Sequence, residues 1–83
     1  MKLTFKLFAS LTALLPKEAR DHAIEIEVAD NVTALELIDR FRVPRKSAHL
    51  VLVNGVYLDP DDRGAPNLRD GDTIAIWPPV AGG

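Results

Sequence analysis

The chain has 83 residues, 47% of them hydrophobic, and its 12 acidic and 10 basic residues give a formal net charge of -2. This length fits one domain with a modest core, and the hydrophobic share is that of a folded protein rather than a disordered one. The slightly acidic balance gives no general reason to bind nucleic acid or an anionic membrane. Because the chain contains no cysteine, disulfides, thiolate catalysis and the common zinc frameworks are excluded.

Two strands are predicted in the first third of the chain. Apolar and polar residues alternate from Lys2 to Phe8 and again from His22 to Ala29, as in half-buried strands. The start also resembles a secretory signal, but Ser10 and Thr12 interrupt its apolar stretch and no A-x-A cleavage site follows. We therefore expect a cytoplasmic protein, in which Ser10 caps a short helical turn after the first strand.

The main helix is predicted to begin at Thr33. Thr33 and Glu36 have the spacing of a capping box, in which each side chain accepts a hydrogen bond from the other residue's backbone amide. An apolar stripe continues to Phe41, and Glu36 and Arg40 are spaced to form an ion pair on the solvent side. Pro44 is expected to end the helix, because the residue before a proline avoids helical geometry.

Three further strands follow the helix. The continuous apolar run from His49 to Val53 predicts an inner strand covered on both faces. Asn54-Gly55 is a strong hairpin signal that leads into a return strand from Val56 to Leu58. The polar segment from Asp59 to Asn67 indicates a loop, and the last strand is predicted from Thr73 to Trp77.

This order of elements predicts an α+β fold with a mixed sheet of about five strands and one helix on one face. The right-handed crossover rule sets the last strand beside the first and parallel to it. That is the β-grasp arrangement of ubiquitin-like proteins. We expect a β-grasp domain over residues 1–77 and an extended tail over residues 78–83.

Three aromatic residues are predicted to lie on the sheet face that the helix leaves open. If Leu7 and Ile76 face the helix, Phe8 and Trp77 must face the other way, and Tyr57 is expected there too. One interpretation is a satellite core folded over an edge of the sheet. The other is a protein-binding patch next to the tail, since exposed aromatic residues mark interfaces.

Four segments of the chain resemble the MoaD/ThiS family of ubiquitin-like sulfur carriers. They are KLFASLTALL, LVLVNGVYL, LRDGDTIAIW and the ending PPVAGG, and the ending is most similar to that of the molybdopterin synthase small subunit. The resemblance implies that Gly83 is the working residue. Its carboxylate would be adenylated with ATP by a ubiquitin-activating-like adenylyltransferase. A donor such as a cysteine desulfurase or rhodanese would then supply sulfur, converting Gly83 to 1-thioglycine, a thiocarboxylate.

The resemblance also implies a receiving partner. The tail would enter the large subunit of molybdopterin synthase, in a heterotetramer, and pass sulfur to a pterin precursor of the molybdenum cofactor. The tungsten form of the cofactor, thiamine thiazole synthesis and another sulfur acceptor are alternative destinations. Trp77 stands where the family usually has phenylalanine, and the loop from Asp59 to Asn67 is longer than is typical of the family. A further alternative is a ubiquitin-like modifier attached to lysines through Gly83.

The residues of the tail suit insertion into a neighbouring active site. Pro78 and Pro79 favour an extended stem, and residues 78–83 can reach at most ~20 Å. Val80 and Ala81 continue that stem, and Gly82 and Gly83 lack Cβ atoms, so another backbone can approach closely. A terminal carboxylate has a pKa of about 3.5 and is a poor electrophile when ionised, so a partner must activate it.

Other possible sites are weaker. The acidic loop at Asp59, Asp61 and Asp62 departs from the EF-hand pattern, because Arg63 stands where an oxygen ligand is needed. We expect no metal site, no cofactor bound by the isolated chain and no independent catalysis, since no nucleophile, base and orienting group can be assembled.

A small basic cluster lies at the end of the predicted helix, at Arg40, Arg42, Arg45 and Lys46. Such a cluster is either a solvated helix end or a surface that meets an acidic partner.

Overall fold

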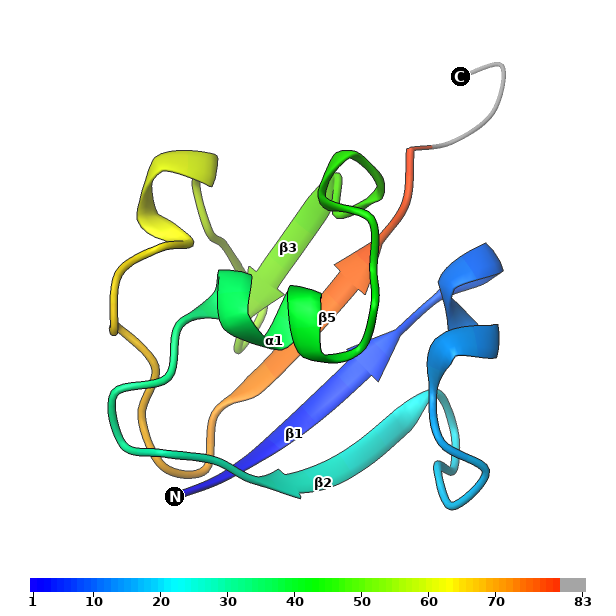
Figure 1. Cartoon of the computed structure of the whole chain (residues 1–83), viewed down its shortest axis with the longest axis horizontal. Helices are drawn as coiled ribbons and strands as arrows, with labels where there is room; N and C mark the ends of the chain where they lie inside the picture. The colour runs from blue at the N-terminus through cyan, green and yellow to red at the C-terminus, as the bar shows by residue number, and fades with distance from the viewer. Residues whose placement is uncertain (80–83) are drawn as a thin grey trace.

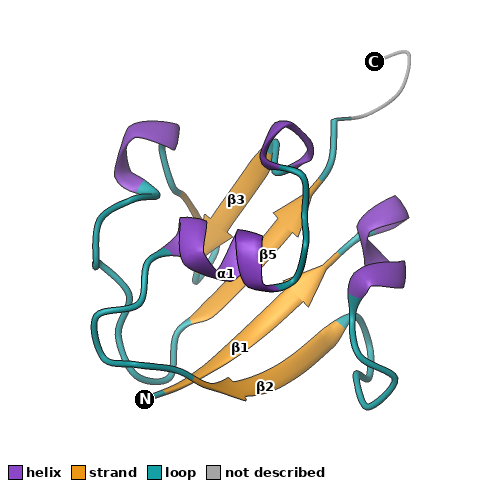
Figure 2. Cartoon of the chain, in the orientation of Figure 1, coloured by secondary structure: helices purple, strands orange, loops and turns teal. Residues whose placement is uncertain are grey.

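The computed structural model describes residues 1–79, which form one mixed sheet with an α-helix against one face (Figure 1). The strands and the helix are β1 (Lys2–Leu7), β2 (Ala23–Glu27), α1 (Ala34–Arg40), β3 (Leu50–Val53), β4 (Val56–Tyr57) and β5 (Thr73–Trp77). Three 3-10 turns connect them, namely η1 (Ala9–Leu14), η2 (Arg45–Ser47) and η3 (Pro60–Asp62) (Figure 2). No helix among these residues is long and apolar enough to cross a membrane.

The sheet has the strand order β2-β1-β5-β3-β4. β5 lies between β1 and β3 and runs parallel to β1, with Phe5 opposite Ile74, and the other neighbouring strands are antiparallel. The predicted crossover is therefore confirmed, and the fold is a β-grasp. The register matters for function, because it decides which side chains of β1 and β5 share a face.

The hydrophobic core fills the space between the sheet and α1. Its fully buried side chains alternate along the strands with residues of the other face, as the pleat requires. They are Leu3, Phe5, Leu7, Leu37, Ile38, Val51, Ile74 and Ile76. Phe5 also stacks on Phe41 at the end of the helix, with ring centroids 4.3 Å apart.

Both ends of α1 are defined by local hydrogen bonds. The predicted capping box is present, since the Glu36 amide donates to Thr33 Oγ1 at 3.1 Å and the Thr33 amide donates to Glu36 Oε1 at 3.0 Å. The predicted Glu36–Arg40 ion pair is wrong. Glu36 is used in the cap, and Arg40 Nη1 donates instead to the carbonyl of Glu27 at 3.4 Å.

The helix ends before Pro44 is reached. Val43 N donates to Ile38 O at 2.9 Å and Arg42 N donates to Asp39 O at 3.0 Å, the paired bonds of a Schellman motif. Arg42 adopts the left-handed conformation of this motif, with φ of 60°, where glycine is usual. The prediction that Pro44 stops the helix is therefore wrong, because the turn at Arg42 has already done so.

Two short-range predictions about turns have opposite outcomes. Asn54 and Gly55 have φ values of 53° and 82°, as a two-residue hairpin of type I′ requires, so the hairpin between β3 and β4 is confirmed. Ser10 does not cap η1. It lies inside the turn, and Phe8 occupies the cap position without a side-chain hydrogen bond.

We predict that Arg42→Gly stabilises the fold by about 1 kcal/mol, because glycine adopts the left-handed conformation without the strain that a Cβ atom causes. Urea denaturation checks this. The control is Arg42→Ala, which removes the same charge and keeps the strain, and should leave stability nearly unchanged. Equal gains in both variants would show that charge, and not backbone strain, is responsible.

Candidate functional site

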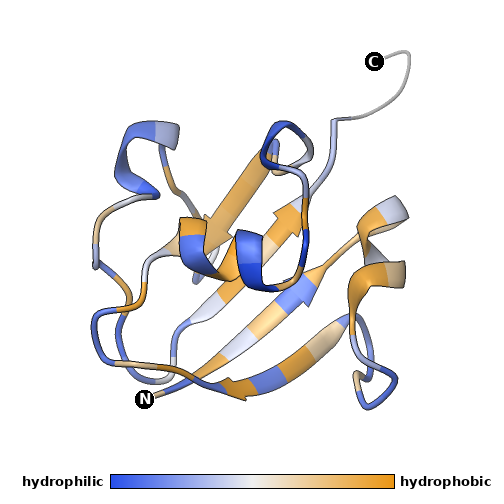
Figure 3. Ribbon diagram, in the orientation of Figure 1, coloured by the Kyte–Doolittle hydropathy of each residue, from blue (hydrophilic) through white to orange (hydrophobic). Residues whose placement is uncertain are grey.

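The sheet face opposite α1 is apolar around β3 and β5. Because Leu50 pairs with Trp77 and Leu52 lies between Ala75 and Tyr57, these five side chains share that face. Leu50 is 36% exposed and Leu52 is half-buried. The prediction that this strand is covered on both faces is therefore wrong, because the helix covers only one. β3 is apolar along its length, whereas apolar and polar residues alternate along β2 (Figure 3).

Phe8 and Trp77 stack on each other at one end of this open face, where β1 and β5 end. Their rings are nearly parallel, at 3°, with centroids 4.2 Å apart. The Phe8 amide donates to the Ile76 carbonyl at 3.1 Å, which extends the β1–β5 pairing by one residue and brings the two rings together. Both residues are half-buried, and neither belongs to the main core cluster. The stack thus lies on the open face, outside the core that the helix covers.

His22 extends this aromatic row. Its ring stacks on Phe8 with centroids 5.0 Å apart, and its Nδ1 lies 3.2 Å from Thr12 Oγ1. The Thr12 hydroxyl donates to the carbonyl of Leu7 at 3.2 Å. The face therefore presents a row of three stacked rings, His22, Phe8 and Trp77.

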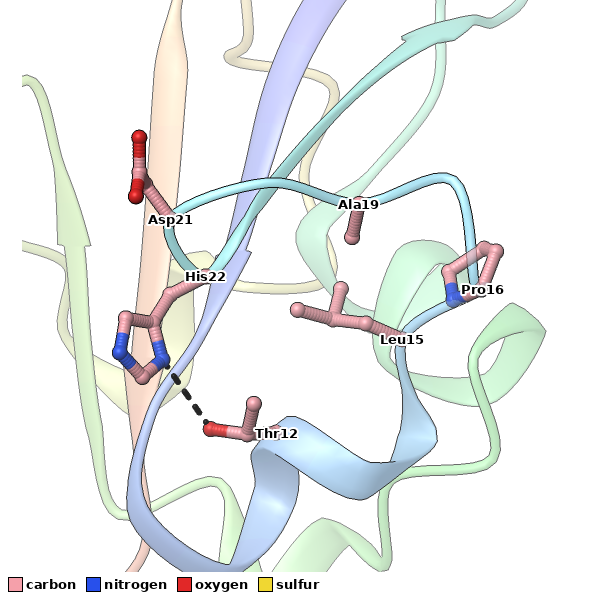
Figure 4. A pocket seen from close by; sticks show the side chains of 6 residues that line it. All are labelled: Thr12, Leu15, Pro16, Ala19, Asp21 and His22. Carbon is pink, nitrogen blue, oxygen red and sulfur yellow. Dashed lines mark hydrogen bonds between the residues drawn. The ribbon is translucent and has the colours of Figure 1, made fainter.

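An open hollow lies beside the His22 end of this row (Figure 4). It is formed by η1 and the turn before β2, where Asp21 and His22 have φ values of 51° and 66°. Its lining residues are Thr12, Leu15, Pro16, Ala19, Asp21 and His22. Among residues 1–79 no three His, Cys, Asp or Glu side chains gather as a metal site would need.

Tyr57 is on the open face but lies apart from the ring stack. Its hydroxyl accepts a hydrogen bond of 3.5 Å from Arg63, whose guanidinium lies 5.8 Å from the Tyr57 ring centroid. Arg63 is 6% exposed and donates to the carbonyls of Ala48, at 2.8 Å, and Leu58, at 3.0 Å. It therefore ties the loop after β4 to the segment before β3. The sequence contained no signal for this, because a single arginine in an acidic loop resembles a solvated one.

The open face also includes residues that sequence reasoning missed. Leu50 and Leu52 could have been found by continuing the alternation through β3. The stacking of His22 could not, because it depends on the left-handed turn at residues 21 and 22.

The start of the tail lies next to the ring stack. Trp77 O accepts a hydrogen bond from His49 N at 3.1 Å, and the two prolines that follow have no amide with which to continue the ladder. Pro78 is half-buried and Pro79 is exposed. In Figure 1 the chain leaves the sheet at this end of β5. The other predicted tail residues, Val80, Ala81, Gly82 and Gly83, lie outside the described residues.

The strand order and the single covering helix give the chain a β-grasp fold of the ubiquitin-like type. The model of the ThiS family matches residues 6–83, and the chain belongs to this family. It is thus a ThiS/MoaD-like sulfur carrier with a ubiquitin-like fold. No curated protein sequence matches the chain.

Solved structures share this fold across the whole chain. The HVO 2177 protein of Haloferax volcanii is 26% identical, with a TM-score of 0.75 over 100% of this chain and 87% of that one. SAMP1 from Haloferax volcanii is 24% identical, with a TM-score of 0.66 over 100% of both chains. A chain in the complex of subunits 1 and 2 of molybdopterin-converting factor from Helicobacter pylori 26695 is 23% identical, with a TM-score of 0.58 over 100% of both chains.

Adjacent residues of β5 should differ in their contribution to stability. Ile76→Ala should lower the free energy of unfolding by about 2–5 kcal/mol, because Ile76 is fully buried under the helix. Trp77→Ala should lower it by a smaller amount, about 1–2 kcal/mol, since it removes one ring stack and the partial burial of the indole on the open face. Urea denaturation of both variants measures this. A loss for Trp77→Ala as large as that for Ile76→Ala would assign Trp77 to the core.

Proposed function

We propose that the chain is the small, sulfur-carrying subunit of a molybdopterin synthase, with Gly83 as its reactive terminal residue. The observation that supports this best is the family match, which extends over the tail to residue 83. The Helicobacter pylori complex, which shares the fold, supports a second, larger subunit as the partner. The cytoplasm, where ATP is available, is the proposed location.

The proposed chemistry takes place at one carbon atom. An oxygen of the Gly83 carboxylate attacks the α-phosphorus of ATP on the activating enzyme, so that an acyl-adenylate forms and pyrophosphate leaves. Sulfur at the oxidation level of sulfide then attacks the acyl carbon, a C–S bond forms, and AMP leaves with the electron pair of the broken C–O bond. The thiocarboxylate that results is a soft nucleophile, by analogy with a thiolate.

The described residues would serve this chemistry by binding the partner protein. Trp77, the last ring of the aromatic row of His22, Phe8 and Trp77, directly precedes Pro78. A partner protein bound to this row would hold the stem of the tail at a fixed distance from the active site of that partner. Holding reacting groups in place in this way replaces a bimolecular encounter by a local one. Tyr57 and Leu50 widen the same apolar face, which suits a protein partner.

A protein modifier attached to lysines is the second candidate, because the ubiquitin-like fold and an activated terminal glycine serve both roles. Thiamine thiazole synthesis is a further destination for the same thiocarboxylate. The sulfur-carrier and modifier roles diverge after adenylation, when either sulfur or a lysine amine attacks the acyl carbon.

Intact-mass analysis of the protein from its native cell separates the two roles. We expect a species ~16 Da heavier than the unmodified chain, because sulfur replaces one carboxylate oxygen and a sulfur atom is heavier than an oxygen atom by that amount. The increase should disappear after Gly83 is deleted. A population that consists only of lysine conjugates would contradict the sulfur-carrier assignment.

Changes at the end of the tail should abolish function without unfolding the domain. Deleting Gly83, or adding one alanine after it, should stop cofactor synthesis in a complementation assay, because the reactive carboxylate is then displaced. The thermal melt should remain unchanged, since the core lies within residues 3–76. Full activity of the extended chain would exclude the proposed mechanism.

Trp77→Ala should weaken binding to the large subunit by about tenfold or more, as for an aromatic residue at the centre of an interface. The matched control is Val56→Ala, which shortens an apolar side chain that is 69% exposed and lies on the helix side of the edge strand β4. Isothermal titration calorimetry with the large subunit measures both. If the two variants bind equally well, the aromatic row is not the docking face.

A further inference from the structure

A second surface, on the helix side of the sheet, lies along the edge strand β2. β2 is the outermost strand of the sheet (Figure 1), and among residues 1–79 no strand pairs with its outer side. A groove runs over its helix-facing side, between η1 and the end of α1. We call it the β2 groove, and its lining residues are Leu14, Pro16, Glu18, Ile24, Ile26, Arg40, Phe41 and Arg42.

The outer edge of β2 presents free backbone groups. Met1 and Val28 exchange two hydrogen bonds, of 2.7 and 2.9 Å, and Leu7 N donates to His22 O at 3.1 Å. Since hydrogen-bonded pairs alternate along an antiparallel ladder, the even-numbered residues of β2 point their backbone groups toward β1. The amide and carbonyl of Glu25 and the amide of Glu27 therefore point outward.

The neighbouring backbone groups of this edge are already used. Ala23 exchanges two hydrogen bonds of 2.9 Å with Arg20, and the Glu27 carbonyl accepts from Arg40. The open stretch is thus short and centred on Glu25.

The floor of the β2 groove is apolar. Ile24 and Phe41 are half-buried, Ile26 is buried with 8% of its surface exposed, and Leu14 on the η1 side is 38% exposed. A strand added beside β2 would place every second side chain over this floor. The groove therefore suits a segment in which apolar residues alternate with others.

The rim of the β2 groove is basic. Arg40 lies over the Phe41 ring, 5.6 Å from its centroid, and forms no ion pair among the described residues. Arg42 likewise forms no ion pair among the described residues. Glu18 is the one acidic residue among those that line the groove. By contrast, Arg45 Nη2 lies 2.8 Å from Asp39 Oδ2, and this hydrogen bond holds the pKa of Asp39 below its ordinary value. The two unpaired guanidinium groups would attract a carboxylate.

We propose that the β2 groove binds an extended acidic–apolar segment of a partner protein, which adds to β2 as a sixth strand. Its apolar side chains lie over Ile24 and Ile26, its main chain pairs with Glu25, and a carboxylate lies against Arg40 and Arg42. This interaction goes beyond the proposed sulfur transfer, because the β2 groove lies on the helix side of the sheet and β2 is separated from β5 by β1.

A second copy of this chain fits the edge less well. In an antiparallel β2–β2 pair, Glu25 and Glu27 of both copies would lie on the same face as cross-strand or diagonal neighbours. Like charges in such positions are destabilising. A partner with threonine or lysine at those positions avoids this repulsion.

The test uses the full chain and a synthetic peptide of ~8 residues, the length of an ordinary strand. The peptide has valine and threonine in alternation and two aspartates at one end, with both termini blocked. Titration followed by NMR should shift the amides of residues 23–27 and 40–42, and leave that of Trp77 unchanged. A peptide with lysines in place of the aspartates should bind at least about tenfold more weakly.

Two pairs of variants separate charge from backbone pairing. Arg40→Glu with Arg42→Glu should weaken binding by about tenfold or more, whereas Arg69→Glu, an exposed arginine outside the groove, should change it by no more than about twofold. Glu25→Pro removes only an outward amide and should abolish binding, whereas Glu25→Thr keeps that amide and should bind normally. A thermal melt confirms that each variant is folded.

Three results would overturn the proposal. They are an absence of shifts in β2 at millimolar peptide, an equal loss of binding for Arg69→Glu and the double variant, and a dimer in size-exclusion chromatography that Glu25→Pro dissociates.

Discussion

The pairing of β1 with β5 is the constraint on which the rest of the structure depends. These two strands lie side by side in the sheet, and their parallel register places Phe5 beside Ile74 and Leu7 beside Ile76 under the helix. The same register sets Phe8 next to Trp77 on the opposite face. A slip of one residue would turn Trp77 into the core and Ile76 out to solvent. Burial of the core thus positions the aromatic row and the start of the tail.

The two surfaces proposed for docking differ in their physical character. The open face is a row of stacked rings flanked by aliphatic side chains. The β2 groove combines a free strand edge with two guanidinium groups that form no ion pair among the described residues. Since the two surfaces lie on different strands and opposite faces, a carrier could remain bound to one protein while its tail is used by another.

Local signals in the chain predicted much of this structure because their physics is local. The capping box at Thr33, the hairpin at Asn54-Gly55 and the alternation in β1 and β2 each involve residues within a few positions of one another. The error about the Glu36–Arg40 ion pair arose from competing partners. Glu36 and Arg40 had the spacing of an ion pair, but the capping box and the Glu27 carbonyl supplied other partners. Which hydrogen-bond partner a side chain takes depends on the other donors and acceptors that the fold places near it.

The sequence by itself determined the element order, the β-grasp arrangement and the outward direction of Phe8 and Trp77, because periodicity and parity need no knowledge of distant residues. Only the tertiary structure decided which outward residues touch. The His22 ring reaches Phe8 through two left-handed residues, and Arg63 is buried where it donates to carbonyls of two separate segments, the one before β3 and the one after β4. Such contacts join residues far apart in the chain, and they can form only after the strands have assembled on both sides of the β1–β5 pair.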